Sequence, residues 1–361
     1  IDIGGTPYTV NLLLADSQCK PEQADDAATA LLDGGAVAVV GDTCNSASFV
    51  AEEIYYAAGV PMVSASSTSP QITDRGLDTT FRVITREDTW PIRAAEPLYT
   101  TYAIHSVAII AMEGYDDITA INAFVDAYEV TLGGTITSTN VITSEDDVNA
   151  ALVKIQVEGA NAIYFPWNDA TLAGQVALEA YDLGMVDVPI FWDSMSEVKA
   201  MLNDYDTAAG AAAEMNYATF YYRDPSEMPG YDEFNTAYVA AAFPNYGDEA
   251  QMWGAFAYDA AKIILEAIDR ADSTDPADIR DAIASTADYA GVVGSYEGFD
   301  GKGDVIPQWG DMLRSLNGEW LNLHPDPATL PAYTYRTDNF ASPTLASEWS
   351  WINESADYWS L

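Results

Sequence analysis

Short apolar runs alternate with longer amphipathic stretches from the first residues of the chain onward. A β-type run followed by a helical stretch and then another β-type run is typical of parallel strands joined by helical crossovers. The strands expected in this first series are 10–17, 36–42, 60–66 and 81–85, with helices at 21–32 and 46–59. In the first of these helices Ala24, Ala28 and Leu31 recur on one face, and Gly34 marks its end.

A second series of the same kind begins near residue 88. Its expected strands are 106–113, 135–142, 161–167 and 188–194, with helices at 88–102, 116–132, 146–160 and 169–184. A strand-like run at 214–222, helices at 232–243, 249–271 and 275–286, and a Gly- and Trp-rich tail from Tyr289 complete the chain. The pattern predicts an α/β protein with two doubly wound parallel sheets, and a length of 361 residues agrees with two domains.

Charge excludes one large class of function. The chain has 56 Asp and Glu but only 14 Lys and Arg, for a formal net charge of −42. Nucleic-acid binding needs clustered cations that displace counterions from phosphates, and an anionic membrane surface is disfavoured for the same reason. No stretch approaches the roughly 18 uninterrupted apolar residues of a membrane span.

The imbalance arises more from missing base than from added acid, because charged residues make up only 19% of the chain. In strong brine the Debye length falls to about 3 Å, so repulsion between surface carboxylates is screened. A carboxylate-rich, Lys-poor surface therefore suits a halophilic protein. The alternative is an ordinary acidic extracellular protein. The sequence leaves both interpretations open.

Two cysteines, Cys19 and Cys44, each follow an apolar run. If those runs are neighbouring parallel strands, their ends lie side by side and a disulfide is feasible, which would place the protein outside a reducing cytosol. Two unrelated free thiols are the alternative.

Enzyme motifs are mostly absent. The two histidines, His105 and His324, stand alone, and the chain has neither a phosphate-binding loop nor a dinucleotide-binding glycine motif. The acidic segments 269–278 and 299–304 lack the spacing of a calcium loop and are better explained as helix caps and turns. We therefore expect no catalytic residues, no metal site and no cofactor.

Small polar residues gather where the expected strands end. Ligands of open α/β sheets bind beyond the carboxyl ends of strands, where helix N-termini present unpaired N–H groups. The first sheet offers 43–46 and 64–70, whose hydroxyl and amide groups suit a carboxylate. The second offers Tyr115, Trp167, Asn168, Asp169 and Asp193, which supply aromatic surface and carboxylates suited to an ammonium group. Each residue alone could be a cap or turn, but the set favours a binding cleft.

The segments GDTCNSAS (41–48) and VPMVSASSTSPQITDRG (60–76) resemble the leucine/isoleucine/valine-binding family of type I periplasmic binding proteins, the solute receptors of amino-acid ABC importers. DSQCKPEQA (16–24) and YDAAKIILEAI (258–268) extend the resemblance over nearly the whole chain. It implies a Cys19–Cys44 disulfide, an extracytoplasmic location and a receptor for an amino acid or close analogue that works with an ABC permease rather than an enzyme.

The resemblance also implies two lobes joined by three crossovers, near 84–87, 217–222 and 296–300, with hinge closure around the ligand. The implied lobes are 1–85 plus 220–296 and 86–219 plus 297–361.

By position, Asn45, Ser66 and Thr68 would hold the ligand carboxylate and ammonium from the first lobe. Tyr115 and Asp193 match second-lobe positions, with Asp193 as the partner of the α-ammonium. Trp167 and Trp192 are candidates for the side-chain pocket, and the alternative for each is a core aromatic. Asn168 or Asp169 stands where branched-chain receptors often have Tyr, which argues against a purely aliphatic ligand.

Family members begin with a strand, a glycine-containing loop and a helix that this sequence lacks, so we expect an incomplete first lobe. The Trp-rich extension after about Leu323 exceeds the usual ending. It supports an alternative in which the fold serves a surface structural or sensory protein that self-associates through the tail. Periplasmic, surface-anchored and secreted forms all agree with the sequence.

Overall fold

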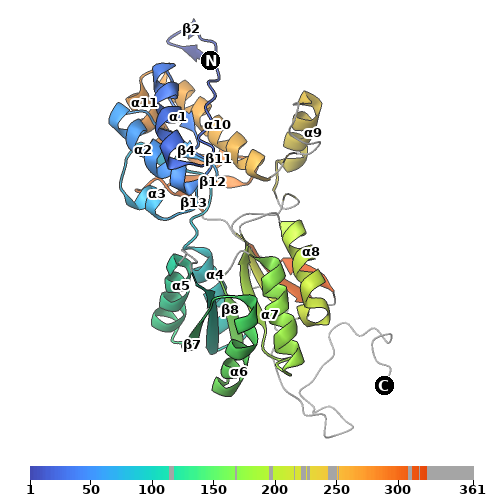
Figure 1. Ribbon diagram of the computed structural model, residues 1–361. Helices are drawn as coiled ribbons and strands as arrows, with labels where there is room; N and C mark the ends of the chain where they lie inside the picture. The colour runs from blue at the N-terminus through green and yellow to red at the C-terminus, as the bar shows by residue number, and fades with distance from the viewer. Residues whose placement is uncertain are drawn as a thin grey trace.

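The computed structural model describes most of the chain and shows two groups of elements (Figure 1). The described residues are 1–113, 118–166, 169–194, 198–214, 216–220, 225, 228–242, 250, 252–307, 311–316 and 318–322.

The larger group is built on a seven-stranded sheet with the order β15-β14-β10-β9-β8-β6-β7. Five of its strands are parallel: β6 (Ser106–Met112), β7 (Thr135–Ile142), β8 (Ala162–Phe165), β9 (Ile190–Ser194) and β10 (Tyr217–Phe220). The other two, β14 (Asp311–Leu316) and β15 (Glu319–Asn322), form an antiparallel hairpin on the edge next to β10. This arrangement confirms an α/β fold with a large parallel sheet.

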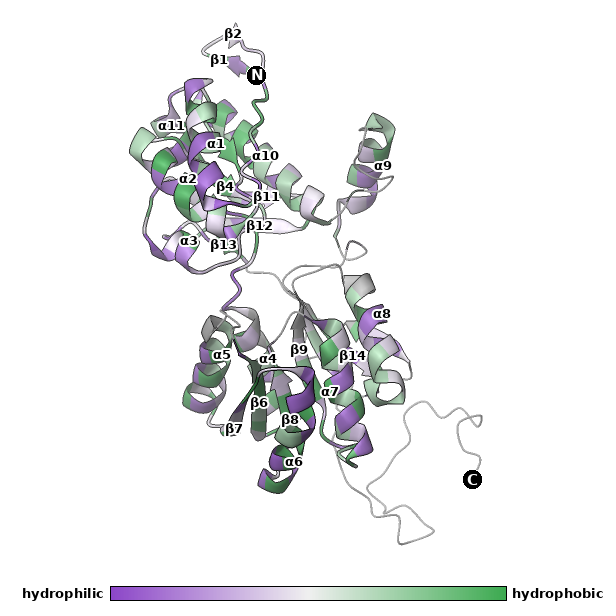
Figure 2. Ribbon diagram, viewed as in Figure 1, coloured by the Kyte–Doolittle hydropathy of each residue, from purple (hydrophilic) through white to green (hydrophobic). Residues whose placement is uncertain are grey.

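Both faces of this sheet are buried, which explains why its strands are continuous apolar runs. Alternate residues enter two different cores: Ile109 and Tyr164 pack on one face, whereas Ile110 and Ile163 pack on the other. The first face is covered by α4 (Trp90–Thr100), α5 (Ile118–Val125) and the π-helical turn η1 (Asp126–Thr131), and the second by α6 (Val148–Glu158), α7 (Ala170–Asp182) and α8 (Val198–Ala209). Figure 2 shows these strands as hydrophobic and the covering helices as mixed.

The chain order reverses at β6, because β7 lies on one side of it and β8 on the other. In open α/β sheets such a switch point leaves a crevice beyond the strand ends in which ligands bind. The segments that follow β6 and β8 are those in which the sequence places Tyr115, Trp167, Asn168 and Asp169.

The smaller group contains a parallel sheet of three strands, β3 (Val39–Val40), β4 (Met62–Ser64) and β5 (Thr80–Arg82). Met62 packs with residues of α1 (Pro21–Asp33) and α2 (Asn45–Ala58), whereas Val63 and Phe81 belong to the core that contains α10 (Met252–Ala271). The short helix α3 (Gln71–Asp74) lies between β4 and β5, and α11 (Pro276–Ala284) packs on α10. Gly59 ends α2 in the left-handed conformation at φ 70°, which glycine adopts without a steric penalty.

A second small sheet, antiparallel, consists of β11 (Ala287–Ala290), β12 (Ser295–Phe299) and β13 (Val305–Ile306). Arg82 of β5 forms a β-bridge with Asp304, so this sheet continues the smaller group through residue 306. The described chain then enters the larger sheet at β14. The remaining elements are the hairpin β1 (Asp2–Ile3) with β2 (Thr6–Pro7), the 3₁₀ turns η2 (Glu145–Asp147) and η3 (Gly210–Ala213), and α9 (Tyr231–Ala241).

The structure differs from the sequence expectations at two elements: one expected strand does not form, and one helix was not expected. Residues 8–17 form no strand, and Leu12 and Leu14 are more than 80% exposed, because this apolar run pairs with no neighbouring strand among the described residues. The helix α8 was not expected at all. Its apolar residues Leu202, Tyr205 and Ala209 recur at helical spacing and pack into the core, so the sequence does carry a signal for this helix that was overlooked.

Cys19 and Cys44 form the disulfide, with Cα atoms 5.3 Å apart. The bridge joins the segment before α1 to the residue that caps α2, where Ser46 Oγ also donates to the Cys19 carbonyl at 3.2 Å. It therefore fixes the N-terminal end of α2 although residues 8–20 belong to no sheet.

Replacing both cysteines, Cys19→Ser with Cys44→Ser, should lower the free energy of unfolding by about 3 kcal/mol, because the cross-link closes a loop of 25 residues in the unfolded chain. Denaturant unfolding of the two proteins under oxidising conditions measures the difference. Equal midpoints and slopes would show that the bridge contributes nothing to stability.

Candidate functional site

Two polar loops lie side by side at the carboxyl ends of β3 and β4. Asn45 Oδ1 accepts a hydrogen bond from the Ser69 N–H at 3.1 Å, and Ser66 Oγ donates to the Thr43 carbonyl at 2.7 Å. Deeper in the same region, the hydroxyls of Ser48 and Ser67 are 2.7 Å apart. The structure thus brings together the three residues that the sequence assigned to the first lobe.

Thr68 is the most deeply placed of these residues, with 1% of its surface exposed. Its Oγ1 donates to Glu87 Oε2 at 2.8 Å, and its carbonyl accepts the Glu87 N–H at 3.0 Å. Because the hydroxyl proton is directed at a carboxylate, Thr68 Oγ1 faces any further partner as an acceptor. Thr68 and Glu87 together make a local acceptor pair suited to an ammonium group.

Arg82 holds the backbone on either side of Thr68. Its guanidinium is fully buried and donates to the carbonyls of Ser67 at 3.2 Å and Ser69 at 2.8 Å. Its Nε donates to Asp304 Oδ1 at 2.5 Å, so the buried charge is paired. A buried cation with these partners fixes the loop, since any displacement would leave it unpaired.

Hydrogen-bond donors face the same region. Cys44 occupies the N-cap position of α2, but its side chain makes no capping hydrogen bond. The N–H groups of Asn45 and Ser46 make no hydrogen bond within the described part of the chain. The Thr68 N–H likewise has no partner among the described residues. Unpaired N–H groups at the N-terminus of a fourteen-residue helix favour an anion such as a carboxylate.

The second-lobe predictions divide into two sets. Tyr115, Trp167 and Asn168 lie outside the described residues. Asp169 follows β8, where its Oδ1 accepts the Leu172 N–H at 2.9 Å and caps α7. Asp193 is in β9 and pairs in register with Thr219 of β10, at the carboxyl end of the strand.

Trp192 is a core residue. It is fully buried and stacks on Tyr205 at a centroid distance of 5.0 Å, with Trp320 edge-on at 6.4 Å. Of the two alternatives for Trp192, the structure favours the core aromatic, because successive strand residues point to opposite faces and this position packs against α8.

Sequence reasoning missed Glu87 and Arg82. Arg82 is the last residue of the third parallel strand, β5, and Glu87 lies in the segment that follows it, where the rule that selected the loops after β3 and β4 applies equally. Nothing local signals that Arg82 reaches Asp304, which is 222 residues away in the chain.

A second buried acid lies behind the two loops. Glu52 of α2 is fully buried, its Oε1 accepts from Arg75 Nη1 at 2.6 Å, and its Oε2 has no hydrogen-bond partner among the described residues. Burial raises the pKa of Glu52 to about 7 in spite of the Arg75 charge. Arg75 directly follows α3, so this contact joins α2 to the segment that leaves the Thr68 loop.

Taken together, an α/β fold with a sheet switch point and unpaired N–H groups beside acceptors at the strand ends are typical of a solute-binding protein. Residues 2–310 match the family described as "Periplasmic binding protein", and the chain belongs to that family. It is a family of extracytoplasmic substrate-binding receptors, not of enzymes. In the described part of the chain, none of the helices has the length and hydropathy needed to cross a membrane.

Three comparisons show how close the resemblance is. The chain is 27% identical over 314 residues to an "Amino acid binding protein" of Pseudomonas aeruginosa, covering 84% of this chain and 79% of that protein. It is 26% identical over 300 residues to "Leu/Ile/Val-binding protein homolog 2" of Brucella abortus, covering 82% and 76%. An ABC transporter substrate-binding protein from Desulfitobacterium hafniense, solved as a complex with Leu, is 26% identical with a TM-score of 0.68 and coverage of 89% and 90%.

The buried Glu52 makes stability depend on pH. Its pKa is about 7 in the folded protein but near 4.5 in an unfolded chain, so the folded state holds more protons between these values. The Glu52 contribution to the free energy of unfolding should therefore be largest below pH 4.5, fall as the pH rises, and level off above 7. Glu52→Gln should flatten this fall when denaturant unfolding is measured from pH 4.5 to 8.

The matched control is Glu53→Gln, because Glu53 is the next residue on α2 and also pairs with Arg75 but is exposed. It should keep the wild-type slope. A Glu52→Gln profile parallel to that of the wild type would show that Glu52 is ionised throughout this range.

Proposed function

We propose that this protein is a receptor that binds a free α-amino acid or a close analogue outside the cytoplasm and delivers it to an ABC importer. The observation that carries the proposal is the placement of unpaired N–H groups, on Asn45, Ser46 and Thr68, beside the acceptor pair of Thr68 and Glu87. A zwitterion needs both kinds of group within the length of one molecule.

The carboxylate of the ligand accepts hydrogen bonds from the α2 N-terminus and the Thr68 N–H, with the helix dipole adding to the attraction. The α-ammonium donates to Thr68 Oγ1 and the Glu87 carboxylate. Ser66 contributes as an acceptor, because its own proton is directed at the Thr43 carbonyl. The relatives include an amino-acid binding protein and a substrate-binding protein solved as a complex with Leu, which supports this class of ligand.

From the larger lobe we assign Tyr115, Trp167, Asn168, Asp169 and Asp193 to the same ligand. Asp193 is the proposed partner of the α-ammonium. Asp169 already caps α7 through Oδ1, so we give it the lesser role. The polar character of Asn168 and Asp169 favours a ligand whose side chain is not purely aliphatic.

We divide the chain into lobes of 1–85 plus 220–296 and 86–219 plus 297–361, with closure around the ligand by hinge motion. The pairing of β12 with β13 and the Arg82–Asp304 bridge support moving the last boundary to the residues after Ile306. We further propose that the protein has no catalytic activity and is held in the periplasm or at the cell surface. Self-association through the tail concerns residues outside those described and stays a prediction.

Thr68→Val and Asp193→Asn should each weaken binding of the preferred amino acid. Both remove a partner of the α-ammonium, and hydrogen bonds to a charged group are worth about 1.5–3 kcal/mol, so we expect roughly 10- to 100-fold higher Kd values. Calorimetric titration of the wild type against an amino-acid panel identifies the ligand first, and the variants are then titrated with it.

The matched controls are Thr29→Val on α1 and Asp204→Asn on α8, both exposed. They should bind like the wild type. If no amino acid, amide, short peptide or small carboxylate binds the wild type, the proposed function is wrong. If the ligand binds both variants with unchanged Kd, the site lies elsewhere.

A further inference from the structure

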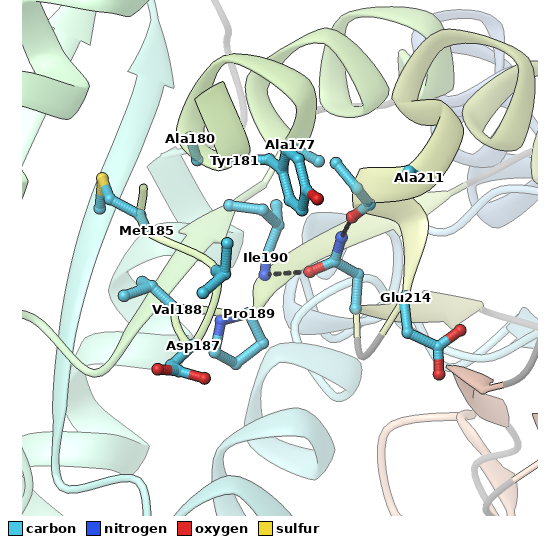
Figure 3. A pocket seen from close by; sticks show the side chains of 13 residues that line it. Ala177, Ala180, Tyr181, Met185, Asp187, Val188, Pro189, Ile190, Ala211 and Glu214 are labelled. Atoms are coloured by element: carbon cyan, nitrogen blue, oxygen red, sulfur yellow. Dashed lines mark hydrogen bonds between the residues drawn. The ribbon is translucent and has the colours of Figure 1, made fainter. Parts of the chain in front are cut away.

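A cavity of about 290 Å³ lies at the amino ends of β9 and β10, the edge of the large sheet opposite the one assigned to the amino acid. It is bounded by the end of α7, the loop from α7 to β9, and the connection from η3 to β10. Figure 3 shows side chains from these segments around one opening.

The floor of this cavity is apolar. Met185, Pro189 and Ile190 are buried there. Asn216 is the one amide side chain in the lining, and both its polar atoms are hydrogen-bonded within the protein. Its Oδ1 accepts the Ile190 N–H at 2.7 Å and its Nδ2 donates to the Ala212 carbonyl at 2.6 Å. The floor therefore offers hydrocarbon surface and no further strong hydrogen bond, which suits the apolar body of a small molecule.

The rim has a different character. Tyr181 extends from α7 at one margin of the cavity, and the carboxylates of Asp187 and Glu214 lie at two other margins (Figure 3). Asp187 is exposed and forms no ion pair with any described Lys or Arg, and no described cation lines the cavity. An aromatic ring and two carboxylates around one opening attract positive charge through the ring quadrupole and the Coulomb term.

We propose that this cavity is a second binding site, for a small organic cation that carries an ammonium or quaternary ammonium group on a short apolar body. The apolar part lies against Met185, Pro189 and Ile190, and the cationic head lies between Tyr181 and Asp187. A volume of about 290 Å³ is at the small end of ligand pockets, which favours a free small molecule. The proposal does not depend on the amino-acid site.

Butyltrimethylammonium is the probe, titrated calorimetrically at constant ionic strength, with butyrate and butan-1-ol as the anionic and neutral analogues. The wild type should bind the cation at least tenfold more tightly than either analogue. Asp187→Asn and Tyr181→Leu should each weaken the cation at least fivefold.

Two controls locate the effect. Asp182→Asn removes the same charge from an exposed residue at the end of α7 that does not line the cavity, and it should leave the Kd unchanged. Thr68→Val should also leave it unchanged, because Thr68 belongs to the other site. Equal affinity for butyrate, no loss in Asp187→Asn, or a loss in Thr68→Val would each overturn the proposal.

A fourth titration separates a free cation from a protein side chain of the same chemistry. Nα-acetyl-arginine amide carries its positive charge on the side chain of a peptide unit. If it binds more weakly than butyltrimethylammonium, the cavity serves a free small molecule as proposed. If it binds more tightly, the cavity is a docking point for a protein partner and the proposal is wrong.

Discussion

The buried guanidinium of Arg82 is the constraint on which the smaller lobe depends. It reaches the carbonyls on both sides of Thr68, and its charge is paired with Asp304 from the far end of the chain. Asp304 also accepts from Thr73 of α3 and from Arg86, which lies just before α4. Removing one partner of a buried ion pair leaves an uncompensated charge. The Thr68 loop, α3, the segment 82–86 and the segment of Asp304 must therefore fold together. The Arg82 guanidinium thus fixes the Thr68 loop, the end of β5 and the segment around Asp304, after which the chain enters the larger sheet.

This constraint explains how a short sheet can present a defined site. The three strands β3 to β5 contain only two or three residues each, so ladder hydrogen bonds alone give little rigidity. The loops beyond them are instead held by side chain to backbone bonds such as Ser66 to Thr43 and Ser69 to Asn45, and by the disulfide at Cys44. What remains unpaired after these bonds are made is a small set of N–H groups and acceptors. Preorganisation of this kind lowers the entropic cost of binding.

The sequence predicted most of the larger sheet and only part of the smaller one. Strands such as β6 and β8 are apolar on both faces, so their own residues reveal them. Residues 8–17 have the same apolar character, yet they form no strand, because a strand needs a partner and none of the described residues provides one. Asn45, Ser66 and Thr68 were predictable since the strand-end rule is local. Glu87 follows β5, where the same local rule applies but was not used, and the burial of Trp192 depended on which face of β9 it occupies.

Charge enters the function less directly than the composition suggests. A net charge of −42 opposes anions at long range, yet the proposed ligand is a zwitterion with no net charge to steer. The site therefore works by local dipoles and the acceptor pair of Thr68 and Glu87 rather than by the field of the whole molecule. A brine-adapted exterior stays a prediction from composition. The same acidic surface gives the second cavity its preference for a cation.

The most direct test of the central claim is a crystal structure of the protein with its preferred amino acid bound. The account predicts that the α-carboxylate lies within hydrogen-bond distance of the N–H groups of Ser46 and Thr68, with the α-ammonium on Thr68 Oγ1 and the Glu87 carboxylate. An amino acid bound with its carboxylate away from the α2 N-terminus, or bound at a different edge of the sheets, would contradict it.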